Sequence, residues 1–247
     1  MLETLGIVQV RQDNDAVRGK LARRLGGKSL LEWVVRRATD CQRLDGVVVV
    51  LTDSPEDCRL AELVPTDVPV CLGGERDELA RVSAVLDRYP AHSAVNINVD
   101  YPFIDPVLID RLVSTAAAHP ASDYISYCAR NGRPALLSPL GGLAEWFRVK
   151  ALRKADREAK HAPDRDQATR YLYSHPEKFN LRLIPMPLEL DRDDVRLTID
   201  SEEDWDLAQT VLEALGPDHL DWQRISGLLD HQPALRERMA ELNRAGV

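Results

Sequence analysis

Short apolar runs alternate with amphipathic stretches along the first half of the chain. Residues 4–10 and 46–52 are apolar and rich in β-branched side chains, and the second run reads GVVVVLT. Such runs are typical of strands that are buried on both faces of a parallel sheet. After a polar loop, apolar residues recur at helical spacing over 30–38. The pattern therefore predicts a strand, a loop, a helix and a second strand.

The same alternation continues as far as residue 118. The pattern predicts strands at 68–72 and 94–99, and helices at 77–89 and 105–118. The sequence Ser54-Pro55-Glu56 predicts a further helix start, because proline suits the first helical position. Strands that alternate with helices form right-handed crossovers in a parallel sheet. Ligand-binding side chains are then expected at the carboxyl ends of the strands.

The second half of the chain has a less regular pattern. It predicts strands at 124–128, 181–185 and 195–199, with a charge-rich helical segment at 149–173. Ser201 and the acidic residues that follow it are typical of a helix start. We therefore expect further strands and helices around the same core.

The length of the chain and the pattern of its last residues together predict one domain with a C-terminal extension. The chain has 247 residues, which is long for one core and short for two full domains. Residues 218–243 have the pattern of two amphipathic helices, broken at Gln232-Pro233, that pack on the domain. We predict an α/β fold in which a single Rossmann-like domain with a mostly parallel sheet spans 1–216, and a helical C-terminal extension spans 217–247.

Composition argues against several classes of protein. The net charge of -8, from 32 basic and 40 acidic residues, lacks the basic excess that a nucleic-acid-binding surface needs. The four cysteines are widely spaced and form no C-x-x-C pair, which favours reduced thiols over a zinc site or a disulfide framework. No apolar run approaches the roughly 18 residues of a membrane span, and the N-terminus has no signal-peptide pattern. We expect a cytoplasmic protein with no nucleic-acid partner and no membrane insertion.

Two carboxylates stand out by their placement. Asp100 and Asp200 each follow directly after a predicted strand, in NINVD and RLTID. Both are therefore expected at the edge of the sheet that binds ligands. Two carboxylates from distant strand ends can hold Mg²⁺, which prefers carboxylate oxygens and bridges substrate phosphates. The alternative is that both residues are N-caps of the helices that follow them.

The segment 11–28 combines cations with glycines. Glycines allow the backbone to approach a ligand closely, and cations supply charge opposite a polyphosphate. The alternative is an ordinary solvated surface. The residues concerned are Arg11, Arg18, Gly19, Lys20, Arg23, Arg24, Gly26, Gly27 and Lys28.

Motifs along nearly the whole chain resemble those of one family. Gln9, Arg11, Gly19 and Lys20 match its first motif, Q-A-R-x-G-S-T-R-L-P-G-K, and LGGKSLLE at 25–32 matches its L-x-G-K-P-L-L-E. Later segments that match in the same order are GGERDELAR at 73–81, NVDYPFIDP at 98–106, RDQATRYLY at 165–173 and RLTIDSEED at 196–204. The chain resembles the cytidylyltransferases, which include spore-coat polysaccharide proteins of the SpsF type and enzymes that activate Kdo and sialic acids.

The resemblance implies a fold of the nucleotide-diphospho-sugar transferase type and a homodimer. It implies Mg²⁺-dependent transfer of CMP from CTP to a sugar or sugar acid, with release of pyrophosphate, for surface polysaccharide or glycan precursor synthesis. By the resemblance, Arg11 and Lys20 bind the triphosphate while Asp100 and Asp200 hold Mg²⁺, and these four are the catalytic residues. The implied nucleotide-binding residues are Gln9, Arg11, Gly19, Lys20, Lys28, Asp77 and Arg81.

The chain departs from the family pattern at several positions. Asn14-Asp15-Ala16 stands where the family has Ser-Thr-Arg, Val99 replaces a glycine, and Asp166 and Gln167 replace a Glu-His pair. These departures leave two alternatives open. One is a nucleotide-binding or regulatory homologue that no longer transfers; the other is a transferase for another nucleotide or for a phosphonate acceptor. The retained catalytic residues favour an active cytidylyltransferase.

Overall fold

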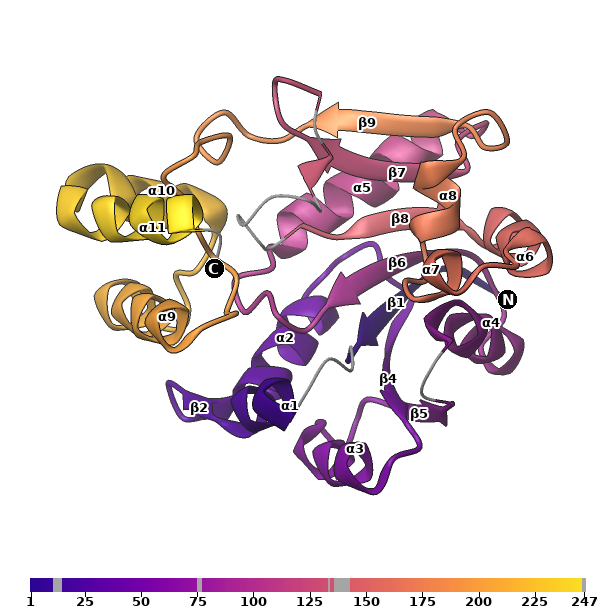
Figure 1. Cartoon of the computed structure of the whole chain (residues 1–247), viewed down its shortest axis with the longest axis horizontal. Coiled ribbons are helices and arrows are strands. Elements are labelled where there is room, and N and C mark those ends of the chain that lie inside the picture. The colour runs from indigo at the N-terminus through magenta and orange to yellow at the C-terminus, as the bar shows by residue number, and fades with distance from the viewer. Residues whose placement is uncertain (11–14, 75–76, 133, 136–142, 246–247) are drawn as a thin grey trace.

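A mostly parallel sheet forms the centre of the molecule (Figure 1). The computed structural model describes residues 1–10, 15–74, 77–132, 134–135 and 143–245. Within these residues the main sheet has 7 strands in the order β5-β4-β1-β6-β8-β7-β9. Neighbouring strands run parallel except at β8, which is antiparallel to both β6 and β7. The predicted α/β fold with a mostly parallel sheet is confirmed.

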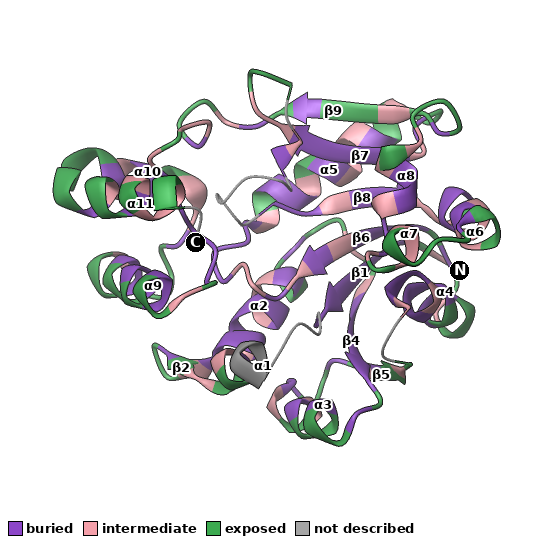
Figure 2. Cartoon of the chain, in the orientation of Figure 1, coloured by how far each residue is buried: buried purple, intermediate pink, exposed green. Residues whose placement is uncertain are grey.

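The strands follow the apolar runs of the sequence. They are β1 (Leu2–Gln9), β4 (Gly46–Thr52), β5 (Val70–Gly73), β6 (Ala91–Asn98), β7 (Tyr124–Cys128), β8 (Glu145–Arg148) and β9 (Leu181–Pro185). In β4 every residue after Gly46 is buried, because helices cover both faces of the sheet. Figure 2 shows the central strands buried and the outer surfaces of the helices exposed.

Helices surround the sheet in two layers. They are α1 (Asp15–Ala22), α2 (Leu30–Thr39), α3 (Pro55–Leu60), α4 (Glu78–Arg88), α5 (Pro106–Ala118), α6 (Val149–Glu158), α7 (Ala162–Arg165), α8 (Arg170–Ser174), α9 (Glu202–Leu215), α10 (Trp222–His231) and α11 (Pro233–Ala245), with a 3-10 turn at Ala61–Leu63. One core cluster joins the sheet to α2, α5 and α9–α11. A second cluster joins the opposite face to α4, α6 and α8.

The tail packs on the rest of the molecule. Ile225 and Leu229 of α10 and Met239 of α11 belong to the larger core cluster, and each is almost fully buried. The N–H of Trp222 donates to the carboxylate of Asp105 at 2.8 Å, which ties the start of α10 to the start of α5. In the part of the chain that the structure describes, the helices lack the length and apolar character needed to cross a membrane.

Three predictions of local structure are wrong. Residues 195–199 are extended and buried but lie outside the sheet, because Ile199 bonds to the backbone of Asp100 rather than to a strand edge. Residues 15–22, which the sequence pattern suggested as loop, form helix α1. The helical segment predicted at 149–173 is divided into α6, α7 and α8, and Pro163 stands at the start of α7, where it cannot continue a preceding helix.

A small hairpin, β2 (Arg24–Leu25) and β3 (Lys28–Ser29), links α1 to α2. Its turn has Gly26 and Gly27 at φ of 57° and 89°, in the left-handed region that glycine adopts without strain. A Cβ on Gly26 would lie 2.6 Å from the Leu212 side chain of α9. The turn glycines therefore serve the geometry of the hairpin and its close packing on α9.

Candidate functional site

Segments that carry three of the predicted catalytic residues meet beyond the carboxyl end of β6. The N–H of Ile199 donates to the carbonyl oxygen of Asp100 at 3.2 Å, which holds the two aspartate-bearing segments side by side. The ammonium group of Lys20, on α1, donates to the carbonyl oxygen of Asp200, across a sequence separation of 180 residues. The structure thus brings Lys20, Asp100 and Asp200 together. Arg11 lies outside the described residues.

The alternative that Asp100 and Asp200 are helix caps is wrong. Helix α9 is capped by Ser201, whose hydroxyl accepts a hydrogen bond from the N–H of Asp204 at 3.2 Å. Helix α5 is capped by Asp105, whose carboxylate accepts from the N–H of Val107 at 2.8 Å. Because other residues occupy the N-cap positions, helix capping does not explain where the two aspartates lie.

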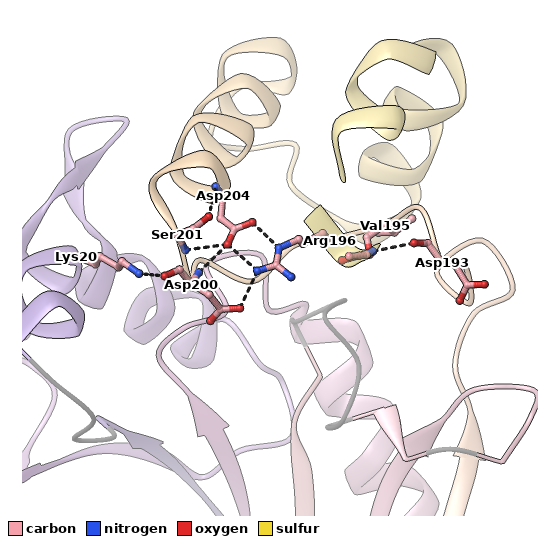
Figure 3. A network of polar contacts seen from close by, with 8 residues as sticks. Lys20, Asp193, Val195, Arg196, Asp200, Ser201 and Asp204 are labelled. Carbon is pink, nitrogen blue, oxygen red and sulfur yellow. Dashed lines mark hydrogen bonds and ion pairs between the residues drawn. The ribbon is translucent and has the colours of Figure 1, made fainter. Parts of the chain in front are cut away.

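A buried ion pair supports Asp200 from behind. Arg196 and Asp204 pair through Nε and Oδ1 at 2.5 Å, with 2% and 0% of their side chains exposed. The second oxygen of Asp204 accepts hydrogen bonds from the backbone N–H groups of Asp200 and Ser201 at 3.0 and 2.9 Å. Arg196 also donates to the carboxylate of Asp200 at 3.2 Å. The pair therefore orients both the backbone and the side chain of Asp200 (Figure 3).

The same contacts determine the charge state of Asp204. Burial by itself would raise its pKa, because it disfavours the charged form. Hydrogen bonds from Arg196 and from the backbone of Asp200 and Ser201 outweigh burial, so that its pKa is lowered. Asp204 is therefore held as a carboxylate that can balance Arg196.

The donor set at this place fits a magnesium ion. The side chain of Asp200 is 50% exposed and therefore accessible to a ligand. Mg²⁺ is usually bound by one or two carboxylates, several waters and substrate phosphates rather than by a cage of protein ligands. Within the described residues no group of three or more His, Cys, Asp or Glu side chains is arranged to hold a metal. Asp100 and Asp200 together match the small carboxylate set that Mg²⁺ needs from a protein.

The segment around Arg23 connects α1 to α9. Its guanidinium pairs with the carboxylate of Glu202 at 2.6 Å. It also lies 4.0 Å above the ring of Trp205, in a cation–π arrangement. The basic segment that carries Lys20 is thus attached to the helix that follows Asp200.

Two predicted nucleotide-binding residues lie at the turn between β5 and α4. Asp77 caps α4, accepting from the N–H of Ala80 at 2.8 Å, and pairs with Arg165 at 2.6 Å. Arg81 is buried and donates to the carbonyl oxygen of Gly74 at 2.8 Å, and burial lowers its pKa. These contacts support the shape of the turn, and the role of both residues in nucleotide binding stays a prediction.

The remaining predicted nucleotide-binding residues are scattered around the carboxyl end of β1. Gly19 lies within α1, where a Cβ would have open space, so the structure shows no close backbone approach there. Lys28, on the hairpin, lies 4.8 Å above the ring of Trp33. Gln9 is the last residue of β1 and is buried. Nucleotide binding by these residues also stays a prediction.

A row of polar side chains extends from Gln9 across the sheet, and sequence reasoning missed its other two members, Asn96 and Glu145. The amide of Gln9 donates to the side-chain oxygen of Asn96 at 2.5 Å, and the amide of Asn96 donates to the carboxylate of Glu145 at 3.1 Å. In the sequence, polar residues at spacing two in the otherwise apolar stretch AVNINV would have signalled this row. Glu145 gave no such signal, because β8 has only 4 residues.

Comparisons with known proteins identify a family and relatives that match nearly the whole chain. A family model described as cytidylyltransferase matches residues 5–230. The spore coat polysaccharide biosynthesis protein SpsF of Bacillus subtilis is 27% identical over 249 residues, which cover 98% of this chain and 100% of that protein. An uncharacterized protein of Methanocaldococcus jannaschii is 29% identical over 236 residues, covering 95% of this chain and 93% of that protein.

A solved structure shows the same fold. The structure of a cytidylyltransferase from Leptospira borgpetersenii has a TM-score of 0.82 to this chain at 22% sequence identity. The match covers 95% of this chain and 97% of the other. At that identity the likeness establishes the fold, which is the one expected from the sequence motifs.

Proposed function

Because this chain belongs to the cytidylyltransferase family, we propose that it transfers CMP from CTP to a hydroxyl group of a sugar or sugar acid and releases pyrophosphate. Membership of the family makes the chain a nucleotidyltransferase. We also propose that the product is a precursor of a surface polysaccharide or glycan. The name of the Bacillus subtilis relative supports that role, since it assigns that protein to polysaccharide synthesis.

The observation that supports this proposal most is the convergence of Lys20, Asp100 and Asp200. The ammonium group of Lys20 contacts the backbone of Asp200, and the segments that carry Asp100 and Asp200 lie side by side beyond the carboxyl end of a parallel strand, where α/β sheets bind their ligands. Phosphoryl transfer needs little covalent help from a protein, and catalysis consists mainly of positioning and charge neutralisation. A cation and a metal-binding carboxylate pair supply both.

In the proposed reaction the oxygen of the acceptor hydroxyl attacks the α-phosphorus of CTP. The bond from that phosphorus to the oxygen bridging the α- and β-phosphates breaks as the new bond forms, and pyrophosphate leaves with the bridging oxygen. The hydroxyl proton passes to solvent. Lys20 and, as the sequence resemblance implies, Arg11 neutralise charge on the phosphates during this change.

Asp100 and Asp200 are the residues that would hold Mg²⁺. When bound there, the ion would supply positive charge to the phosphate oxygens and a template for their orientation. The buried pair of Arg196 and Asp204 keeps Asp200 in place for this task. Lys20 contributes a second time, since its bond to the carbonyl of Asp200 links the phosphate-binding and metal-binding groups.

A thermal-shift panel tests this function. CTP, UTP, GTP and ATP are each added with and without Mg²⁺, since a ligand that binds the folded state stabilises it. At 100 times its Kd, CTP with Mg²⁺ is expected to stabilise the fold by about 2.7 kcal/mol, which raises Tm by roughly 5–10 °C for a chain of this size. The other nucleotides are expected to give much smaller shifts.

The panel can also contradict the proposal. Equal shifts with all four nucleotides would point to unselective phosphate binding, and a CTP shift that ignores Mg²⁺ would argue against the carboxylate pair as a metal site. If no nucleotide raises Tm, the result supports the alternative of a diverged homologue that no longer transfers. The homodimer and the cytoplasmic location stay predictions.

A further inference from the structure

One face of the sheet changes from apolar to polar at the edge that binds ligands. On β1, Leu5 and Ile7 belong to the smaller core cluster, and the next residue on the same face is Gln9. On β6, Ala94 belongs to that cluster and is followed on the same face by Asn96. On β8, which runs the other way, Glu145 lies opposite Asn96 in the register. Gln9, Asn96 and Glu145 thus form one row, which we name the polar row.

The polar row includes a carboxylate that contacts only neutral donors. Glu145 accepts hydrogen bonds from the hydroxyl of Tyr124, from the hydroxyl of Thr169 at 2.9 Å and from the amide of Asn96 at 3.1 Å. Among the residues that the structure describes, no lysine, arginine or histidine pairs with it. No basic side chain among these residues neutralises the charge of Glu145, so that charge can act on a ligand.

The charge of Glu145 also fixes the direction of the hydrogen bonds along the polar row. An ionised carboxylate has no proton to donate, so Asn96 must present its amide nitrogen to Glu145 and its oxygen to Gln9. Gln9 must then turn its amide nitrogen to Asn96 at 2.5 Å. Its own oxygen is left buried and without a hydrogen-bond partner within the described part of the chain. Gln9 is 2% exposed, so this oxygen is closed to solvent, and Gln9 serves to orient Asn96.

Solvent reaches the centre of the polar row. Asn96 and Glu145 are half-buried, whereas Tyr124 and Thr169, which donate to Glu145, are fully buried. The polar row therefore presents the carboxylate of Glu145 near solvent, and each amide nitrogen of the row has used one of its two N–H bonds within the row. A ligand that binds there meets a negatively charged acceptor at Glu145.

The order of the strands indicates which substrate the polar row faces. Apart from Gln9, which ends β1, the predicted nucleotide-binding residues follow β1 and β5, which lie on one side of β6 in the order β5-β4-β1-β6-β8. Glu145 lies in β8, on the other side of β6, and Asp100 follows the end of β6 between them. The acceptor, which is the second substrate, is therefore expected on the β8 side of the sheet.

We propose that Glu145 binds a hydroxyl group of the acceptor and selects an uncharged sugar against a sugar acid. The proposal rests on the transferase function given above and narrows its acceptor to one class. A sugar hydroxyl can donate a hydrogen bond to the carboxylate of Glu145. The carboxylate of a sugar acid has no proton to donate and carries negative charge, so at this place it meets repulsion from Glu145.

The test measures pyrophosphate release from CTP with Mg²⁺. The acceptors are the uncharged and the anionic fractions of a bacterial metabolite extract, separated by anion exchange, together with Kdo and N-acetylneuraminate as pure sugar acids. We expect the wild-type protein to use the uncharged fraction and to ignore the two acids. In the variant Glu145→Gln, kcat/KM for the uncharged acceptor is expected to fall roughly tenfold or more, with the KM for CTP unchanged.

Two further variants separate charge selection from a structural role. Glu145→Asp keeps the carboxylate, so it should keep the preference for an uncharged acceptor even where its rate is lower. Glu177→Gln removes an exposed charge elsewhere on the surface and serves as the matched control with no change expected. Transfer to the sugar acids or to the anionic fraction alone would overturn the inference and leave the transferase function standing. Release with neither fraction would remove the proposed function, and this inference with it.

Discussion

Changing Asp200 to asparagine is expected to reduce CMP transfer by about a hundredfold or more while the fold keeps its stability. The substitution removes one negative charge from the proposed magnesium site but keeps an oxygen of the same shape. Asp200 is 50% exposed and caps no helix, so the folded state depends little on its charge. Tm is expected to change by no more than about 2 °C, as is usual for exposed positions.

The matched control for this experiment is Asp193→Asn. Asp193 is exposed and precedes the same extended segment, and its carboxylate points away from Arg196 (Figure 3). Pyrophosphate release should be normal in this variant. Asp100→Asn should resemble Asp200→Asn, and the double variant should be little worse than either, because residues that act as one unit give non-additive losses. Full activity in Asp200→Asn would refute the proposed metal site.

Changing Asp204 to alanine should produce the opposite pattern, with a large loss of stability. Asp204 is fully buried, pairs with Arg196 and accepts from two backbone N–H groups. Removing one partner of a buried pair leaves the other charge uncompensated, which costs about 3–5 kcal/mol. For a chain of this size the Tm should fall by roughly 10 °C, as measured by calorimetry or circular dichroism.

Asp206→Ala provides the comparison for this loss. Asp206 lies on the exposed side of the same helix, so its removal should change the free energy of unfolding by about 0.5 kcal/mol or less. Transfer activity should fall in Asp204→Ala even at temperatures where the variant is folded, because Asp200 loses its backbone anchor. A variant as stable as the wild type would show that the buried pair adds nothing to the fold.

Asp204 also predicts how the free energy of unfolding depends on pH. The pKa of Asp204 is lowered in the folded state, so its contribution is present above the pKa of about 3.9 that an unfolded aspartate has. The contribution is lost as the pH falls through the lower pKa of the folded protein. Urea unfolding of the wild type and of Asp204→Ala should therefore differ most near pH 7, and the difference should shrink as the pH falls below the pKa of an unfolded aspartate and through the lowered pKa of the folded protein. A difference that is constant with pH would contradict this assignment.

Much of the fold could be predicted because the buried strands carry a strong local signal. The ranges 46–52, 124–128 and 181–185 coincide with β4, β7 and β9. The signal failed at 195–199, which is as buried as a strand but bonds to the loop at Asp100. Burial determines the apolar pattern of a segment, whereas membership of a sheet depends on which backbone lies beside it.

The candidate site could be predicted only in part. Asp100 and Asp200 were selected because each follows an apolar run that predicts a strand. Asp100 does follow β6, whereas the run before Asp200 lies outside the sheet, and a backbone hydrogen bond still brings the two segments together. Asp204 and Glu145 were not selected, because their importance depends on which buried groups lie opposite them. Glu145 faces Asn96 through an antiparallel strand that the regular alternation of the first half does not predict. Side-chain partners across such a register cannot be read from local pattern.

The attachment of Arg23 to α9 has a mechanical consequence. Arg23 joins the end of α1 to Glu202 and Trp205, and Lys20 joins the same helix to the backbone of Asp200. The proposed phosphate anchor, Lys20, and the proposed metal ligand, Asp200, are therefore linked to each other, and Ile199 fastens them to the loop at Asp100. A movement of α9 would carry both groups together and preserve their spacing.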